Sequence, residues 1–188
     1  MGRGGRGVGG GRPEGHGASV EGGRTRQTEG MDLISPDPGR WAARFDRHRW
    51  RIRLALPQAR TEHIGSTAIG TICAKDVVDI LVGEVDVTAA AQALVSAGYV
   101  IEGERPNHIW LCWPDPQQRE AVVHVVIAGG DIWHQRLLFR DFLKRSPAEA
   151  RAYEALKQRL AAQTDDWGEY TAQKAAFVAR ILQRAAES

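Results

Sequence analysis

Residues 62–70 read EHIGSTAIG, and residues 74–82 read AKDVVDILV. The apolar run around Asp79 is typical of a buried central strand, where an Asp is costly unless it is paired or binds a cation. The preceding Gly65 and Ser66 supply a hydroxyl and a backbone that allows close approach, as a phosphate site requires. Each signal alone also fits a turn or an edge strand. Together they predict a phosphate and metal site, with the aspartate as a Mg²⁺ ligand.

Apolar periodicity and turn signals predict an α+β fold. Helices are expected over 40–56, 87–97, 132–144, 147–160 and 165–186, and strands over 59–64, 76–82, 99–102, 108–113 and 121–127. Thr88 and Asp131 are the expected caps of the second and third helices. The Pro-Asp-Pro turn at 114–116 predicts an antiparallel hairpin. This order predicts a small mixed sheet with helices packed on it and a C-terminal helical segment.

The first 30 residues differ in composition from the rest. They hold 12 of the 21 glycines, five Arg and three Glu, and such a stretch cannot bury enough apolar surface to offset its ordering entropy. We expect a disordered tail over 1–30 and a folded domain over 31–188. Two alternatives stay open: an RNA-binding Gly/Arg segment, although it lacks interleaved aromatic residues, and an upstream extension with Met31 as the true start.

Residues 31–188 are electrically balanced, with 20 basic and 20 acidic side chains. This balance argues against a nucleic-acid-binding protein and against a polybasic membrane-surface protein. The chain has no run of 18 apolar residues and no apolar core of a signal peptide. Two cysteines are too few for a disulfide scaffold or a cysteine-rich zinc site. We therefore expect a cytoplasmic protein.

Several motifs, in the right order, resemble the GrpB family (also called UPF0157) over nearly all of residues 31–184. The most specific is EHIGSTA at 62–68, followed by Ala74-Lys75 and Val78-Asp79-Ile80. The other matches are PDPGRWAARF at 36–45, HVV at 124–126, LFRDFL at 138–143, YEALK at 153–157 and YTAQKAAF at 170–177. The family looks like a branch of the nucleotidyltransferase superfamily. The resemblance therefore implies a polymerase-β-like fold.

In that superfamily a Gly-Ser pair cradles a triphosphate, and carboxylates on two strands hold divalent metals for an in-line displacement. The resemblance implies Gly65 and Ser66 as the phosphate loop and Asp79 as the first carboxylate, with Mg²⁺ as cofactor and a nucleoside triphosphate as substrate. Leu81 occupies the second carboxylate position, which argues against a full two-metal site and leaves open a single Mg²⁺ held by Asp79 and substrate phosphates. The third strand offers His124, for which a metal ligand, a general base and a core residue all stay open.

The remaining candidate binding residues flank this loop or lie on later helices: His63, Thr67, Lys75, Arg140 and Lys174. His63 either contacts a phosphate, donates a proton or orients the loop. The two lysines either bind phosphate or are solvated. Arg140 is a candidate for bidentate binding of a phosphate or carboxylate. We do not expect it to pair with the adjacent Asp141, because neighbouring helical side chains point about 100° apart.

The sequence departs from the family pattern at several places. Gly70-Thr71 replaces Pro-Gly, Lys75-Asp76 replaces Lys-Pro, and Val122 replaces a histidine, so we expect a more flexible loop and a less polar site. Three functions stay open. They are nucleotidyl transfer to a small molecule, nucleotide binding without catalysis, and an accessory role through a protein partner. The last is conceivable because related domains are attached to dephospho-coenzyme A kinases.

Overall fold

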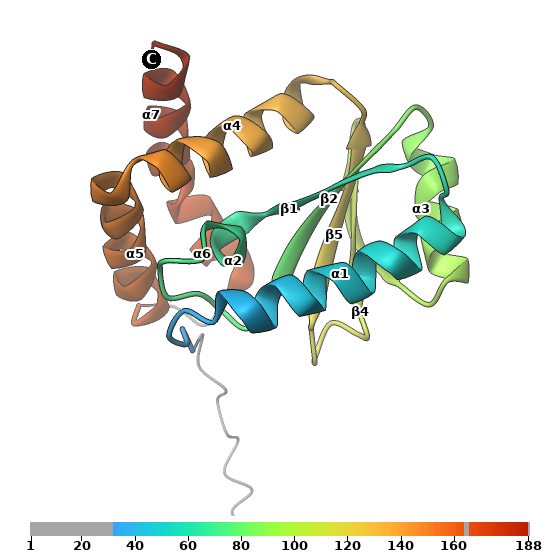
Figure 1. The fold of residues 1–188 in the computed structure, drawn as a ribbon, viewed down its shortest axis with the longest axis horizontal. Coiled ribbons are helices and arrows are strands. Elements are labelled where there is room, and N and C mark those ends of the chain that lie inside the picture. The colour runs from blue at the N-terminus through green and yellow to red at the C-terminus, as the bar shows by residue number, and fades with distance from the viewer. Residues whose placement is uncertain (1–31, 164–165, 188) are drawn as a thin grey trace, which may run out of the picture.

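The computed structural model describes residues 32–163 and 166–187 and contains a five-stranded mixed sheet with helices packed on it (Figure 1). The strands are β1 (Arg60–Ile64), β2 (Val78–Glu84), β3 (Val100–Arg105), β4 (His108–Trp113) and β5 (Ala121–Ile127). In the order β1-β2-β5-β4-β3, β2 and β5 run parallel, and the other neighbours are antiparallel. The α+β class, the mixed sheet and the β4–β5 hairpin are confirmed.

The described residues form seven helices. They are α1 (Pro38–Ala55), α2 (Gly65–Ile69), α3 (Val87–Ser96), α4 (Asp131–Arg145), α5 (Pro147–Ala161), α6 (Trp167–Gln173) and α7 (Ala175–Ala186). Helices α1 and α3 pack on the sheet, whereas α5, α6 and α7 gather at one end of the molecule, on the side away from α3 (Figure 1). The predicted C-terminal helical segment is therefore present.

The main core lies between the sheet and the two helices α1 and α3. Side chains alternate between the faces of a strand, so Ile80 and Val82 of β2 point to the same face as Val123 of β5. There they pack with Trp41 and Ile52 of α1 in one apolar cluster. Burial of this kind stabilises a fold by about 25 cal/mol for each Å² of apolar surface, so this cluster fixes α1 across the sheet.

A second core joins α2 to the C-terminal helices. Ile69 of α2 packs in one buried cluster with Phe142 of α4, Tyr153 of α5 and Ile181 of α7. The C-terminal helices are thus held against the short helix that follows β1. This contact brings residues more than 70 positions apart in the sequence together.

Two segments differ from the sequence prediction in type. Residues 65–67, expected as a bend, begin the five-residue helix α2, which ends at Gly70 with a φ of 78°. The helix expected over 165–186 is divided into α6 and α7. At the division the backbone N–H of Lys174 donates to the Thr171 carbonyl at 3.3 Å, a tighter turn than an α-helix makes.

The two expected helix caps are also wrong by one or two residues. Asp86 rather than Thr88 caps α3, because its carboxylate accepts a hydrogen bond from the Ala89 N–H at 2.9 Å. Gly130 precedes α4, so that Asp131 is the first helical residue instead of the cap. There its negative charge still lies at the helix end that favours it.

The expectations for residues 1–30 and for Met31 lie outside the described residues. Within the described ranges, no helix is both long enough and apolar enough to cross a bilayer.

We predict that Gly83→Ala destabilises the protein by about 1–3 kcal/mol, because an added methyl group overpacks the core. A Cβ at Gly83 would lie 2.7 Å from the Trp133 ring and 3.2 Å from the Ala128 backbone, and that ring is only 6% exposed. Urea unfolding followed by circular dichroism measures the loss. The control is Gly39→Ala in α1, where the nearest atom is 3.9 Å away, and its effect should stay within about 1 kcal/mol. Equal effects of the two substitutions would contradict the packing argument.

Candidate functional site

The structure brings Gly65 and Asp79 into direct contact. In the antiparallel pair of β1 and β2, Ile64 lies opposite Asp79, and the next residue, Gly65, turns the chain into α2 with a φ of 71°. A Cβ at this glycine would lie 2.1 Å from the Asp79 Oδ2 atom. Only glycine fits this position, since it has no side chain and adopts positive φ without strain.

The Asp79 carboxylate lies near His124 and within electrostatic range of two cations, Lys174 and Arg136. Its Oδ1 is 3.8 Å from the His124 Nε2 atom, and 36% of its side-chain surface is exposed. Burial opposes its ionisation, but His124, Lys174 and Arg136 outweigh that effect and hold the pKa of the Asp79 carboxyl below its ordinary value. Asp79 is therefore an ionised group that remains accessible from solvent.

The Ser66 hydroxyl faces the C-terminal helices. It acts on the phenol of Tyr153 on α5 and lowers the pKa of that group, but burial outweighs this effect and raises the pKa of the tyrosine to about 12. The Tyr153 ring also stacks against Phe177 of α7, with centroids 5.3 Å apart. Tyr153 thus links the second core to the first turn of α2.

Two lysines lie over one buried aromatic ring. The Nζ atoms of Lys75 and Lys174 are 4.1 and 4.3 Å from the centroid of Tyr170. Burial lowers the pKa of Lys75 to about 7, with a further contribution from Lys174. Burial lowers the pKa of Lys174 to about 8, and the charge of Asp79 partly opposes that change. Both ammonium groups therefore lie in a partly desolvated region, where their charged forms are less stable than in water.

Lys157 and Arg136 add further positive charge. Lys157 is 2% exposed and donates a hydrogen bond to the Cys73 carbonyl, and burial lowers its pKa to about 8. Arg136 is on the exposed surface of α4, and its charge acts on Asp79, His124 and Lys174.

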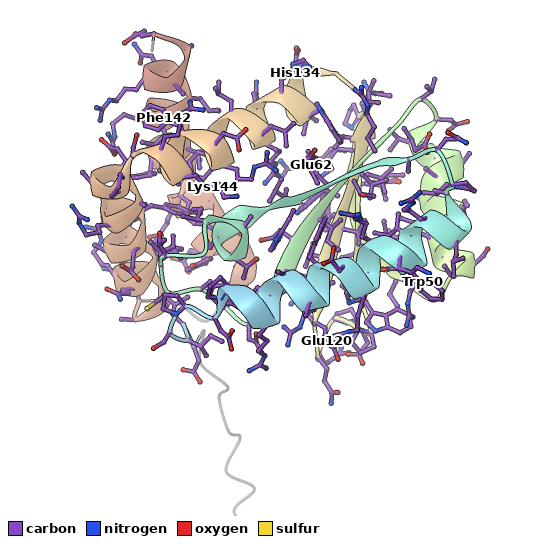
Figure 2. The ribbon with its side chains drawn as sticks, in the orientation of Figure 1. Trp50, Glu62, Glu120, His134, Phe142 and Lys144 are labelled. Atoms are coloured by element: carbon purple, nitrogen blue, oxygen red, sulfur yellow. The ribbon has the colours of Figure 1, made fainter. Side chains whose placement is uncertain are left out.

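Arg140 binds protein groups that join α4 to β1. Its Nη1 donates to the Glu62 carboxylate at 2.7 Å and to the His63 carbonyl at 3.0 Å, and its Nε donates to Asp141 at 2.7 Å. The expectation that Arg140 and Asp141 do not pair is wrong, because the long arginine side chain bends to reach its neighbour. Glu62 lies between β1 and α4 in Figure 2. These three acceptors give Arg140 a structural role.

His63 lies on the sheet face opposite to Asp79. It pairs with Ile80 in the β1–β2 register, and Ile80 belongs to the α1-side core. Its Nε2 is 3.0 Å from the Thr67 hydroxyl, and its ring stacks on Phe45 at 4.9 Å. Burial lowers the pKa of His63 to about 4. Of the alternatives open from the sequence, this geometry supports the one in which His63 and Thr67 orient α2.

Asp76, which replaces the proline of the family pattern, fixes the segment before β2. Its carboxylate accepts hydrogen bonds from Trp41 Nε1 at 3.2 Å and from Arg44 at 3.1 Å, and it also pairs with Arg40. The expected extra freedom of this loop is therefore opposed by three contacts to α1.

Leu81, at the position of the second carboxylate, is fully buried. It shares a face with Asp79 but packs in an apolar cluster with Ile64, Val126 and Trp133. Among the described residues, no group of three or more His, Cys, Asp or Glu side chains could hold a metal ion. The residues present therefore do not fit a two-metal centre.

Sequence reasoning gave no binding role to four residues of this site: Arg136, Tyr153, Lys157 and Tyr170. Three of them belong to the motifs at 153–157 and 170–177, so those motifs were an available signal. Arg136 lies one helical turn before Arg140 and therefore on the same face of α4, which is the signal that could have found it.

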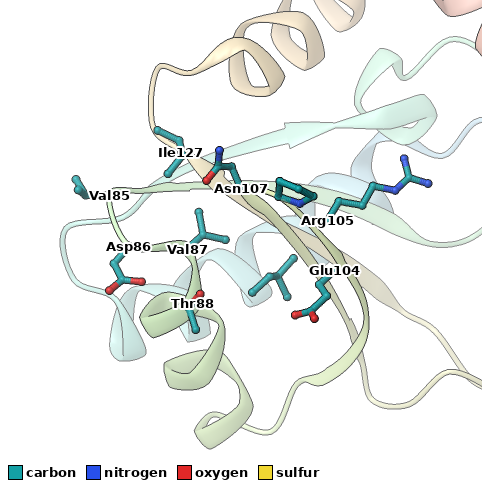
Figure 3. A pocket seen from close by; sticks show the side chains of 10 residues that line it. Val85, Asp86, Val87, Thr88, Glu104, Arg105, Asn107 and Ile127 are labelled. Atoms are coloured by element: carbon teal, nitrogen blue, oxygen red, sulfur yellow. The ribbon is translucent and has the colours of Figure 1, made fainter.

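A surface hollow of about 700 Å³ lies elsewhere, beyond the carboxyl ends of β2 and β5 (Figure 3). Its lining includes Asp86, Thr88, Glu104, Arg105 and Asn107. None of the candidate site residues lines it, and Asp86 is already engaged as the cap of α3. The hollow is therefore separate from the site around Asp79.

Comparison with known proteins identifies relatives. A match to the GrpB protein family spans residues 31–184. The UPF0157 protein SCO7215 of Streptomyces coelicolor is 36% identical over 157 residues, which are 81% of this chain and 83% of that protein. The solved structure of the conserved protein GrpB from Enterococcus faecalis has a TM-score of 0.73 and 27% identity, and it covers 83% of this chain and 98% of that chain.

A weaker likeness, to Cid1 poly(U) polymerase bound to MgATP, has a TM-score of 0.48 and 14% identity over 69% of this chain and 44% of that chain. A likeness of that size says nothing about what this chain binds. The family match covers the same residues as the sequence motifs, and it includes the Gly65–Asp79 contact and the lysines on Tyr170. The chain belongs to the GrpB protein family.

Proposed function

We propose that the site around Asp79 binds the polyphosphate of a nucleoside triphosphate. The observation that carries the proposal is the pair of lysines, Lys75 and Lys174, whose ammonium groups lie 4.1 and 4.3 Å from one tyrosine ring. Two like charges in a partly desolvated place repel each other. A multiply charged anion would relieve that repulsion, and Arg136 would add a third cation.

The protein's own cations, rather than metal ions, support this binding. Leu81 and its apolar neighbours leave Asp79 without a second carboxylate beside it on β2. Lysine and arginine side chains bind phosphate oxygens through charge-assisted hydrogen bonds. The Ser66 hydroxyl, in the first turn of α2, would add a neutral donor.

Lys174→Met should weaken the binding of ATP and of inorganic tripolyphosphate about 10- to 100-fold, because one charge-assisted hydrogen bond contributes about 1.5–3 kcal/mol. Isothermal titration calorimetry and thermal shift, each with Mg²⁺ and with EDTA, measure the effect. The matched control is Lys144→Met, which removes the same charge from an exposed position of α4. The proposal is refuted if neither tripolyphosphate nor any of the four common ribonucleoside triphosphates shifts the melting temperature of the wild-type protein. Equal binding of ATP and tripolyphosphate would assign the site to the phosphates alone.

The affinity for tripolyphosphate should fall about tenfold or more between pH 6.5 and pH 9. The pKa values of Lys75 and Lys174 are about 7 and 8, so both lysines lose their charge as the pH rises through this range, and the anion binds the charged forms. The ligand also titrates, so Lys174→Arg is the reference, since arginine stays charged. The affinity of that variant should depend less on pH. Parallel profiles for the two proteins would argue against a role for Lys174.

Nucleotidyl transfer to a small molecule is a second candidate, favoured by the partly exposed Asp79 carboxylate, which interacts electrostatically with the lysines. In this reaction an acceptor hydroxyl attacks the α-phosphorus and loses its proton to Asp79. The bond between the α-phosphorus and the bridging oxygen breaks, and pyrophosphate leaves along Lys75 and Lys174. No step is assigned to a metal, because the donor set does not fit a two-metal centre.

Asp79→Asn separates the two candidates. If the site only binds nucleotide, the variant should bind tripolyphosphate in EDTA about three- to tenfold more tightly, because one repelling charge, worth about 1 kcal/mol near the surface, is gone. If the site catalyses transfer, the wild-type protein should release pyrophosphate from a nucleotide and the variant should not. Loss of binding in Asp79→Asn would contradict the metal-independent mode.

A further inference from the structure

Two histidines and Asp79 form a continuous line across three strands. His124 of β5 pairs with Trp110 of β4, so His108, two residues earlier on β4, is its diagonal neighbour on the same face. The Nε2 atom of His108 is 3.0 Å from the Nδ1 atom of His124. On its other side, the Nε2 atom of His124 is 3.8 Å from the Asp79 Oδ1 atom.

Burial disfavours the charged form of both rings. Burial lowers the pKa of His108 to about 3, with a further contribution from His124. Burial also lowers the pKa of His124, although Asp79 opposes that change. The groups that act on this pair are the cation of Arg136, which disfavours protonation of both rings, and the carboxylates of Asp79 and Glu102, which favour it at His124. Arg105 also disfavours a charge on His108.

A neutral imidazole carries one N–H and one acceptor nitrogen, so in a hydrogen bond between the two rings one ring donates and the other accepts. If His124 donated it, a bare nitrogen lone pair of His124 would face the Asp79 carboxylate, and two electron-rich atoms would lie 3.8 Å apart. If His108 donates it, the proton of His124 is on Nε2 and faces that carboxylate. The second arrangement gives each polar atom a favourable partner, and the first does not.

We propose that His108 is a positioning residue, which donates its Nε2–H to His124 and thereby fixes the proton of His124 on Nε2, directed toward Asp79. His124 is then a hydrogen-bond donor at the site, and its Nε2 atom is neither a metal ligand nor a general base. Its Nε2–H faces the Oδ1 atom of Asp79, 3.8 Å from Nε2, and would donate to a phosphate oxygen placed beside that carboxylate. The last statement alone depends on the proposed nucleotide binding.

The tautomer is measured directly by long-range ¹⁵N–¹H correlation spectra of the protein labelled at histidine. For His124 the proposal requires a protonated Nε2 and an unprotonated Nδ1 at neutral pH. A wild-type spectrum with the proton on Nδ1 overturns it. Because this measurement needs no ligand and no variant, failure of nucleotide binding would leave it intact, and the two proposals fail separately.

Variants test whether His108 sets that tautomer. His108→Leu removes the donor and should give His124 a mixture of tautomers, together with tripolyphosphate binding about tenfold weaker. His108→Gln keeps an N–H donor and should restore the Nε2 tautomer and an affinity within about threefold of wild type. An unchanged His124 spectrum in the folded His108→Leu variant would contradict the proposal, and so would failure of His108→Gln to restore it.

The control is another buried histidine. His48 of α1 is 4% exposed, and its Nδ1 is 2.9 Å from the Tyr99 hydroxyl on the far side of the sheet. His48→Leu should lower stability and leave both the His124 spectrum and the tripolyphosphate affinity unchanged. If it changes them as much as His108→Leu does, the effect of His108 is general loss of packing and the positioning role is refuted.

Discussion

The contact between the Gly65 backbone and the Asp79 carboxylate constrains the whole site. The α-carbon of Gly65 is so close to the carboxylate that a Cβ would overlap it, and the positive φ of this residue turns the chain from β1 into α2. Because the turn occurs there, the next two side chains point in different directions. Ser66 reaches Tyr153 on the C-terminal helices, and Thr67 reaches His63 on the α1 side. One close approach thus sets the position of both neighbouring hydroxyls.

The second core determines which helices contribute residues to the site. Ile69 of α2 packs with the side chains of α4, α5 and α7, so these helices are anchored to the same short element that contacts Asp79. This packing also brings the polar residues of these helices to the site. Lys174, four residues after Tyr170, lies over the ring of that tyrosine, and Lys75 from the segment before β2 lies over the same ring. The cations of the site therefore come from parts of the chain that only tertiary packing brings together.

How far the sequence predicts this structure depends on the range of the interaction involved. Local patterns sufficed for β4 and β5, whose bounds at 108–113 and 121–127 match the prediction, because apolar runs between turn residues define such strands. The division at Lys174 has no local signal, since neither Pro nor Gly is present there. The contact of Arg140 with Glu62 spans 78 residues, and Arg136 acts on Asp79 only because α4 packs near the sheet. Charge and spacing suggested these residue types, but only packing assigns their partners.

The packing of α4 on β2 explains why no second carboxylate lies beside Asp79 on this strand. Leu81 is buried against Trp133, and the same tryptophan ring contacts Gly83, where even a methyl group would collide with it. An acid at position 81 would place a charge in an apolar cluster, which is costly without a partner. The face of β2 that could extend a metal site is therefore filled by α4. Asp79 remains without a second acid on that face, and the lysines and Arg136, whose charges act on it, are the basis of the proposed anion binding.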